Sequence, residues 1–326
     1  MTKLELFSGT GGFHKGFLDA GFKFEKVLYS EINKHAIANY RYNFKKAIYA
    51  GSVTDIRGNE LPEIDILTFG SPCQDFSIAG NGEGLNGKRS SLVWHAIRII
   101  TETRPSVFIW ENVKGAYSSN RGRDFQAILQ AFANIRSYRL EWQLLNTDWF
   151  LPQNRERIYL IGHLAGRSRP EVFPFREDDK MFNEGERQLP GKVRTKNDIA
   201  NCLTKTMGNV QATGNFIKYT PVLSPDRKEK RQEGRRFKEV GDPAFTINCQ
   251  DRHGVLIQDE VDQKIRRLTE IECERLQGFP DDWTKYGNYD GVIKEIAQTN
   301  RYEMIGNAVS TPAVKAIAER LKNCLI

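Results

Sequence analysis

One cysteine stands directly behind a proline at the end of an apolar run. Residues 64–69 (IDILTF) predict a buried strand, and the glycine-bounded stretch GSPCQDFSIAG at 70–80 follows it, with Cys73 near its start. In open α/β sheets the carboxyl ends of the strands form the edge where ligands bind. A thiol at this edge is a candidate nucleophile, although a lone cysteine in a loop is more commonly a small packed residue.

Three further reactive side chains stand at the ends of other predicted strands. Glu111 ends the strand VFIWE at 107–111, and it shares one sheet edge with Cys73 if the two strands are parallel. Arg155 and Arg157 are one residue apart where the chain enters a strand at 157–162, so both side chains are expected on the same side of the chain. A thiol, a carboxyl group and two guanidinium groups would then face one site.

The stretch FSGTGG at 7–12 follows a predicted strand and opens a helix, a setting in which backbone approaches nucleotide-like ligands. It is not a dinucleotide fingerprint, because His14 stands where the third glycine is required. Glu31 ends the next predicted strand, where a carboxylate accepts hydrogen bonds from both hydroxyls of a ribose. Together these features predict an adenosine-type cofactor without a pyrophosphate, and S-adenosylmethionine fits that description.

The elements that would position these groups alternate along the first 165 residues. Helices are predicted from Gly12 to a stop at Gly21, after Asn33 as N-cap, from Ser90 or Ser91 to Arg104, and after Asp124 as N-cap. Strands are predicted at 4–7, 27–30, near 48, and at 64–69, 107–111, 140–145 and 157–162. This alternation predicts an α/β fold with a mostly parallel sheet covered by helices on both faces.

The middle of the chain has a different character. From about 165 to 264, glycine, asparagine, threonine and basic residues dominate and no amphipathic helix is evident, which predicts a second, smaller and irregular domain. Helix signals return with a capping box at 269–272 (TEIE) and with Thr311 and Pro312, which open a helix with core spacing. The chain is therefore expected to rejoin the first domain at its end.

The positive charge is concentrated in that middle segment. The chain of 326 residues carries a net charge of +7. Residues 192–238 contain twelve Lys or Arg and four Asp or Glu, a net +8, which leaves the rest of the chain at −1. A local excess of this kind indicates a polyanionic partner such as nucleic acid.

The apolar content and the cysteine spacing indicate where in the cell the protein is expected. No stretch reaches the ~18 apolar residues that a membrane span needs, and Met1 leads directly into LELFSG without the pattern of a secretory leader. The five cysteines form no CxxC pair, which fits neither a disulfide framework nor a zinc site. We therefore expect a cytoplasmic protein with free thiols, no metal and no membrane contact.

A family resemblance emerges from the order of these motifs. The series FSGTGG, Glu31, GSPCQDFS, ENV at 111–113, QNRER at 153–157, RLQGFP at 275–280 and GNAVSTP at 306–312 resembles that of the bacterial DNA (cytosine-5) methyltransferases. The resemblance covers about residues 3–163 and 266–322. It implies a Rossmann-like S-adenosylmethionine-dependent catalytic domain from residues 1–165 and 266–326, and a target-recognition domain from 166–265. It also implies double-stranded DNA as partner, a monomer, and a cognate restriction endonuclease as candidate functional partner.

The chemistry of this family assigns the reactive residues. C5 of cytosine is a poor nucleophile, so a thiolate, here Cys73, adds to C6 and makes C5 able to attack a methyl group. Glu111 would donate to N3, which requires a pKa raised by burial. Arg157 would hold O2, and Arg155 would orient the catalytic groups or the DNA backbone. Attack perpendicular to the ring requires a flipped base, and the loop at 74–89 would close over it.

The resemblance also implies a cofactor pocket. Phe7, Gly9, Thr10 and Gly12 would surround the methionine and adenine, with Glu31 on the ribose and Ile32 against the base. One departure is Gly-Ser-Val at 51–53, where the family has Gly-Asp, so that a hydroxyl, or Asp55 nearby, replaces a carboxylate. The remaining pocket residues implied are Ser52, Val53, Pro72, Leu92, Asn307 and Val309.

Two alternatives remain open from the sequence. Methylation of cytosine in transfer RNA uses similar motifs, although the long basic middle segment favours DNA. A DNA-binding regulator on an inactive scaffold is the non-enzymatic alternative, and the intact Cys73, Glu111, Arg155 and Arg157 disfavour it. Amino-methyltransferases would need a Pro-Pro-aromatic stretch where this chain has SPCQDF.

Overall fold

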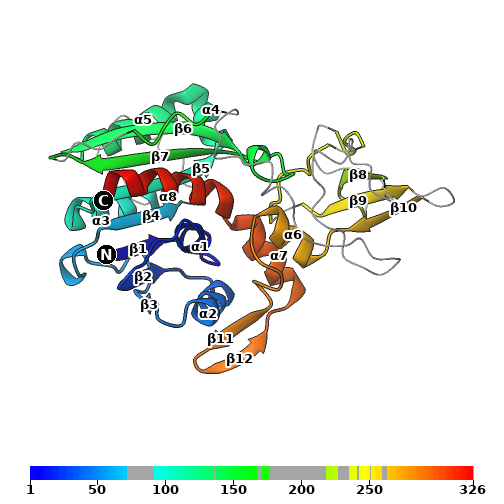
Figure 1. Ribbon diagram of the computed structural model, residues 1–326, viewed down its shortest axis with the longest axis horizontal. Helices are drawn as coiled ribbons and strands as arrows, with labels where there is room; N and C mark the ends of the chain where they lie inside the picture. Colours follow the sequence, from blue (N-terminus) through cyan, green and yellow to red (C-terminus); the bar gives the residue numbers. More distant parts are fainter. Residues whose placement is uncertain are drawn as a thin grey trace.

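A seven-stranded sheet is the central element of the computed structural model, with the strand order β3-β2-β1-β4-β5-β7-β6 (Figure 1). The residues that the structure describes are 1–71, 92–135, 137–166, 171–176, 218–226, 235–240, 242–249, 251–258 and 263–325. The strands of this sheet are β1 (Thr2–Leu6), β2 (Lys26–Ser30), β3 (Ile48–Tyr49), β4 (Ile66–Gly70), β5 (Val107–Val113), β6 (Tyr138–Asn146) and β7 (Glu156–Leu164).

The predicted mostly parallel sheet is confirmed, with one reversed strand. Strands β1 to β5 pair in parallel, whereas β7 runs antiparallel to both β5 and β6. Arg157, near the start of β7, is therefore opposite Val113 at the end of β5. A reversed strand thus brings its first residues to the edge where its neighbours end.

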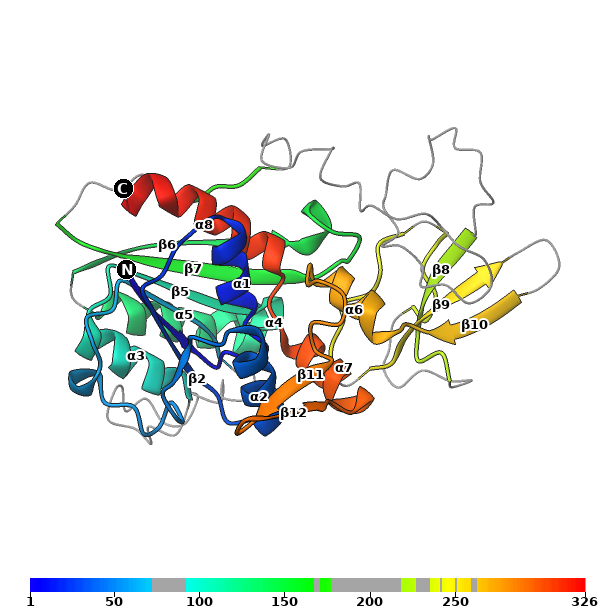
Figure 2. The ribbon, with the colours of Figure 1, turned by 60° about the horizontal axis from the view of Figure 1, so that its bottom comes forward.

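Side chains of successive strand residues point to opposite faces of the sheet, and each face has its own core. On β5, Phe108 and Trp110 join one core, while Val107 and Ile109 join the other. The first core also takes the buried residues of α3 (Leu92–Thr103), α4 (Lys114–Ser118) and α5 (Arg123–Ala133), and the second those of α1 (Gly12–Asp19) and α8 (Thr311–Leu325). Figure 2 shows α1 and α8 on one side of the sheet and α3 and α5 on the other.

Most of the local helix signals are confirmed. The side chain of Asn33 accepts hydrogen bonds at the start of α2 (Lys34–Asn43), and Thr269 and Glu272 form the expected capping box of α6 (Glu270–Leu276). The predicted cap at Asp124 is wrong. Gly122, at φ 84°, is the N-cap of α5, because glycine adopts this left-handed conformation without strain, and Asp124 lies in the first turn.

The chain returns to the first sheet at its end, as expected. A Cβ at Gly16 of α1 would lie 2.6 Å from the side chain of Val314 on α8, so only glycine permits this close packing. Between the main sheet and α8 come a three-stranded antiparallel sheet, two helices and a hairpin. These are β8 (Lys218–Leu223), β9 (His253–Gln258), β10 (Gln263–Arg267), α6, β11 (Tyr286–Tyr289), β12 (Val292–Glu295) and α7 (Gln298–Asn307). In both views α6 lies between the main sheet and the β8–β10 sheet (Figures 1 and 2).

A short strap at 171–176 is fastened to the main sheet after β7. The carboxylate of Glu141 on β6 accepts hydrogen bonds from the backbone N–H groups of Val172 and Phe173. The amide of Gln143 exchanges two hydrogen bonds with the backbone of Phe175, at 2.8 and 2.7 Å. Arg320 of α8 donates to the carbonyl of Val172 at 2.6 Å, so the strap is held by both the sheet and α8.

Candidate active site

The predicted catalytic edge is formed by the carboxyl ends of β4 and β5. Gly70 and Glu111 are register partners on these parallel strands. The next residue, Ser71, receives a hydrogen bond on its hydroxyl from Trp110 Nε1 at 3.0 Å and another from Asn112 Nδ2 at 3.1 Å. The exit from β4 is thereby fixed to the end of β5. Pro72 and Cys73, and the expected lid at 74–89, lie outside the described residues.

The Glu111 carboxyl is buried beside a cation. The residue is 8% exposed, and its Oε1 lies 3.1 Å from Nε of Arg157. That oxygen is buried, and the Arg157 guanidinium is its partner. Burial raises the pKa of Glu111, while the charges of Arg157 and Arg155 oppose the rise. The balance favours a carboxyl group that can hold a proton.

Glycine at position 70 makes room for this carboxyl. A Cβ on Gly70 would lie 3.1 Å from Oε2 of Glu111, tighter than ordinary packing allows. Any side chain there would press on the acid. Neither Gly70 nor Asn112 was singled out from the sequence, although both belong to the motifs GSPCQDFS and ENV.

The two arginines of QNRER are used differently. Arg157 lies against Glu111, as expected for a group facing the site. The guanidinium of Arg155 is 2% exposed and donates to the backbone carbonyls of Ile247 at 2.6 Å and Ala308 at 2.7 Å. The expectation that both guanidinium groups point into one site stays a prediction: the charges of both act on Glu111, but Arg155 gives its hydrogen bonds to backbone carbonyls. Alternation places them on one side of the chain, but Arg155 precedes β7 and turns to the segments that pack there.

The predicted ribose acceptor is held rigidly at the end of β2. One oxygen of Glu31 accepts from the N–H of Gly9 at 2.8 Å, and the other from those of Ile32 at 2.7 Å and Asn33 at 2.9 Å. Gly9 has φ 53°, and no atom lies within 4 Å of where its Cβ would be. Ile32 is 75% exposed. A fixed carboxylate beside an open glycine and an exposed apolar side chain fits a ribose with an attached ring.

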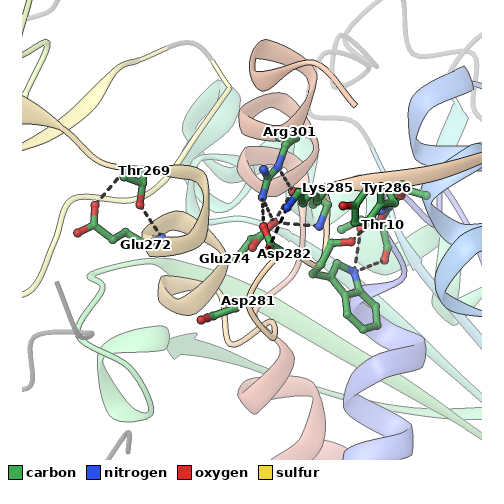
Figure 3. Close-up of polar contacts among 12 residues, drawn as sticks. Thr10, Thr269, Glu272, Glu274, Asp281, Asp282, Lys285, Tyr286 and Arg301 are labelled. Atoms are coloured by element: carbon green, nitrogen blue, oxygen red, sulfur yellow. Dashed lines mark hydrogen bonds and ion pairs between the residues drawn. The ribbon is translucent and has the colours of Figure 1, made fainter. Parts of the chain in front are cut away.

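Other predicted cofactor residues surround the same edge, but several bury their side chains. The Thr10 hydroxyl hydrogen-bonds to Asn39 and to Nε1 of Trp283 (Figure 3). Val53 packs in the core, and Val309 packs on Gly12, where a Cβ would lie 2.6 Å from it. Any contact of Thr10 or Val53 with a cofactor would therefore use backbone atoms. Phe7 and Leu92 are half-buried against the core, Ser52 hydrogen-bonds to Thr54, and Asn307 is exposed.

Comparison with known proteins identifies the family. The family model described as "C-5 cytosine-specific DNA methylase" matches residues 1–323. The chain belongs to the C-5 cytosine-specific DNA methylases. The sequence expectation of a DNA (cytosine-5) methyltransferase is thus confirmed, and this favours DNA over transfer RNA as substrate and an enzyme over an inactive regulator.

Individual relatives agree along the whole methylase. It is 30% identical to "Type II methyltransferase M.Bsp6I" of Bacillus sp. (strain RFL6), covering 98% of both chains. It is 28% identical to "Orphan methyltransferase M.SPRI" of Bacillus phage SPR, covering 98% of this chain and 96% of the relative. The crystal structure of S. pombe Dnmt2 methyltransferase superimposes with a TM-score of 0.65 at 17% identity, covering 99% and 98% of the two chains, and supports the Rossmann-like fold.

The junction between α6 and α7 completes the frame of the methylase. Arg301 on α7 donates to the fully buried carboxylate of Glu274 on α6 at 3.0 Å and lies 3.5 Å from Asp282 (Figure 3).

None of the described helices is long and apolar enough to cross a membrane. Within the described ranges, no cluster of three His, Cys, Asp or Glu side chains could hold a metal ion.

Proposed function

We propose that the methylase transfers a methyl group from S-adenosylmethionine to C5 of a cytosine flipped out of a specific duplex DNA sequence, through a covalent bond from Cys73 to C6. The observation that carries this proposal is the pair formed by Glu111 and Arg157 at the edge where β4 leads towards Cys73. Catalysis is assigned to residues 1–165 and 266–326, and target recognition to 166–265.

The nucleophile is proposed from the anchoring of the chain before it. Ser71 is bound to Trp110 and Asn112 beside Glu111, and Cys73 follows two residues later. Two residues of chain span at most about 7 Å, so the anchor supports a thiol working beside this acid. The thiolate of Cys73 adds to C6, and the electron pair of the C5–C6 double bond moves through the ring towards N3.

Glu111 is proposed as the acid that receives this charge. Burial raises its pKa, so the protonated form is more favoured than in a free carboxyl group, and we propose that its proton is donated to N3 as the thiolate adds. Arg157, 3.1 Å from the carboxyl, would donate to the neighbouring O2 of the base. Because both groups come from adjacent strands, their spacing is set by the sheet and costs little reorganisation during the reaction.

The methyl donor is proposed from the geometry around Glu31. S-adenosylmethionine supplies an electrophilic methyl group on a sulfonium. Glu31 would accept from the ribose hydroxyls with the lone-pair site that its three backbone donors leave on Oε2, and Ile32 would cover the adenine. Asn307 and Val309 would close the pocket from the other side. C5 would take the methyl group as its bond to the sulfonium breaks, and S-adenosylhomocysteine would be released. The N3 proton would return to Glu111, and a base, proposed as water, would take the C5 proton, so that the electron pair of the C5–H bond re-forms the C5–C6 double bond and expels the Cys73 sulfur.

Base flipping follows from the direction of attack. A thiolate must approach C6 perpendicular to the ring, and stacking covers both ring faces in a duplex. The loop at 74–89 is proposed to close over the extruded base. The basic segment at 192–238 is proposed to bind the DNA backbone.

The decisive experiment uses a labelled methyl group. Wild-type protein with S-adenosylmethionine carrying a tritiated methyl is expected to produce labelled 5-methylcytosine in duplex DNA. Cys73→Ala is expected to abolish the label while duplex binding persists, and duplexes with 5-fluorocytosine are expected to trap a covalent adduct with the wild type only. Cys249→Ala removes an exposed free thiol and serves as the matched control. Full methylation by Cys73→Ala, or no adduct with the wild type, would refute the proposal.

Three further assignments accompany this function. We propose a monomer, as the family resemblance implies, and sedimentation of the free protein tests it. We also propose a cytoplasmic location and a cognate restriction endonuclease as functional partner. The partner is tested by assaying host extracts for an endonuclease that cleaves unmethylated DNA and does not cleave the same DNA after methylation by this protein.

A further inference from the structure

The residue that opens the QNRER motif joins two distant parts of the chain. Gln153 is fully buried just before β7. Its Nε2 donates to the carbonyl of Leu276, the last residue of α6, at 2.6 Å. Its Oε1 accepts from the backbone N–H of Ile247 at 2.9 Å. Both ends of one amide thus bind backbone groups of two segments whose side chains also share one buried cluster.

Arg155 extends the same junction towards the proposed cofactor pocket. It binds the carbonyl of Ile247, the residue that Gln153 also holds, and the carbonyl of Ala308. Ala308 lies between Asn307 and Val309, which are proposed to face the cofactor. Two side chains of one short segment therefore fix the same residue of the middle segment and the start of the GNAVSTP motif.

The backbone around Gln153 adds to this attachment. Ala244 and residues 152 and 154 exchange backbone hydrogen bonds at 2.8 and 3.0 Å, and Thr246 donates its hydroxyl to the carbonyl of Asn154 at 2.6 Å. Residues 244–248 also touch the end of α7, where a Cβ on Gly306 would lie 2.5 Å from the Asn248 backbone. We call residues 244–248 the bridging segment. It lies within the proposed recognition domain yet is bound to the catalytic sheet.

We propose that Gln153 is a positioning residue that couples DNA engagement at the bridging segment to the cofactor pocket and to the Glu111–Arg157 pair. The inference rests on the proposed function of that pair. A displacement of the bridging segment would be transmitted through the Gln153 amide to α6 and through Arg155 to Ala308. The displacement would also reach Arg157, which follows Arg155 by two residues at the start of β7. Coupling of this kind is a free energy shared by two binding events, and it is measurable as such.

The test measures coupling without chemistry. Gln153→Ala removes both hydrogen bonds, and Gln143→Ala is the matched control, because Gln143 forms the same two-sided amide contact with Phe175 on the strap. For each protein, the affinity for the duplex that it methylates is measured with and without S-adenosylhomocysteine, which cannot react. The melting temperature and the turnover number are measured in parallel.

The wild type is expected to bind its duplex about tenfold more tightly with S-adenosylhomocysteine present, and Gln153→Ala is expected to reduce that factor towards one. Its turnover number should fall about tenfold while affinity for each ligand alone changes less than about threefold. Gln143→Ala should lower the melting temperature comparably and leave both the coupling factor and turnover unchanged. A wild-type factor of one, or equal effects in the two variants, would overturn the inference.

Two further variants keep the test informative if Gln153→Ala folds poorly. Gln153→Glu keeps the acceptor for Ile247 and loses the donor to Leu276, and it is expected to reduce coupling in part. Thr246→Val removes one hydrogen bond of the bridging segment at a half-buried position and is expected to reduce coupling with little change in melting temperature. If neither variant changes the coupling factor, the inference fails. Because the ligand is unreactive, this outcome is independent of whether Cys73 is the nucleophile.

Discussion

Nε of Arg157 lies 3.1 Å from Oε1 of Glu111, although the two residues approach from strands that run in opposite directions. The reversed strand β7 begins beside the end of β5, where Arg157 is the register partner of Val113. Glu111 lies two residues before Val113, so its side chain projects on the same face of the sheet. The carboxyl group of Glu111 is consequently placed beside the Arg157 guanidinium by two paired strands, not by a loop. Burial nevertheless outweighs the cation, and the pKa of Glu111 is raised.

Replacement of the acid should remove catalysis while leaving binding intact. Glu111→Gln cannot give a proton to N3, so turnover is expected to fall by about 10²–10⁴-fold, as for the loss of a general acid. Duplex affinity, measured by fluorescence anisotropy, should stay within a few-fold of the wild type. Glu156→Gln removes a partly exposed carboxylate that pairs with Lys114 and is the matched control. Equal loss in both variants would exclude a special role for Glu111.

The same substitution should change the dependence of stability on pH. The pKa of Glu111 is higher in the folded protein than its ordinary value of 4.5, so the folded state holds this proton more tightly. Its stabilising contribution is full below that value and is lost as pH rises through the folded pKa. The melting temperature of Glu111→Gln relative to the wild type should therefore increase over this range and then level off. A difference that is constant with pH would contradict the raised pKa.

Two buried histidines should make the protein sensitive to acid. Burial lowers the pKa of His14 to about 3 and that of His253 to about 4, from 6.5. A depressed folded pKa means that stability is present above pH 6.5 and is lost as pH falls towards the folded value. Each histidine should cost about 2 kcal/mol at pH 5 relative to pH 7. His14→Phe should flatten the melting temperature measured between these two pH values, and an unchanged slope would argue against burial of a neutral ring.

The cofactor should depend on the carboxylate of Glu31. Glu31→Gln turns one acceptor into a donor that faces backbone N–H groups and the proposed ribose. Affinity for S-adenosylhomocysteine, measured by calorimetry, is expected to fall at least about tenfold, the equivalent of one charge-assisted hydrogen bond. A cofactor analogue without the ribose hydroxyls should bind both proteins equally. If the variant loses the same affinity for that analogue, Glu31 acts only on the protein backbone.

Removal of Arg301 should destabilise the junction of α6 and α7. Arg301→Met leaves the carboxylate of Glu274 fully buried without its cation, which typically costs about 3–5 kcal/mol. Lys114→Met, which breaks the exposed pair with Glu156, should cost less than about 1 kcal/mol. Urea unfolding of the three proteins distinguishes the two cases. Comparable stability of the two variants would contradict a stabilising buried ion pair between Arg301 and Glu274.

Local signals predicted most of the fold. Hydrophobic runs located the strands of the main sheet, and Asn33 and the capping box at 269–272 marked helix starts, because these features depend on residues within one or two turns. The sequence pattern does not determine the direction of β7, since a buried strand has the same pattern in parallel and antiparallel pairing. The cap at Asp124 was mistaken because Gly122 supplies the required left-handed backbone two residues earlier.

The site could be predicted in its residue types but not in its contacts. Glu31, Glu111 and Arg157 were located from their positions at strand ends, and the structure brings Glu111 and Arg157 together. The different use of Arg155 could not be foreseen, because its partners are 92 and 153 residues away in sequence. Gln153 was missed for the same reason. A residue that binds only backbone leaves no signal in the identity of its partners.

The strap at 171–176 holds the chain against the sheet where it leaves β7. Glu141, Gln143 and Arg320 fasten it to the sheet and to α8 immediately after β7. The end of β7 is therefore held by the strap itself, while the chain beyond residue 176 contacts the residues before β7 through the bridging segment. In the proposed division of the chain, the sequence between the strap and the bridging segment can be exchanged while both attachments stay, so a new DNA target would arise by replacement of that sequence alone.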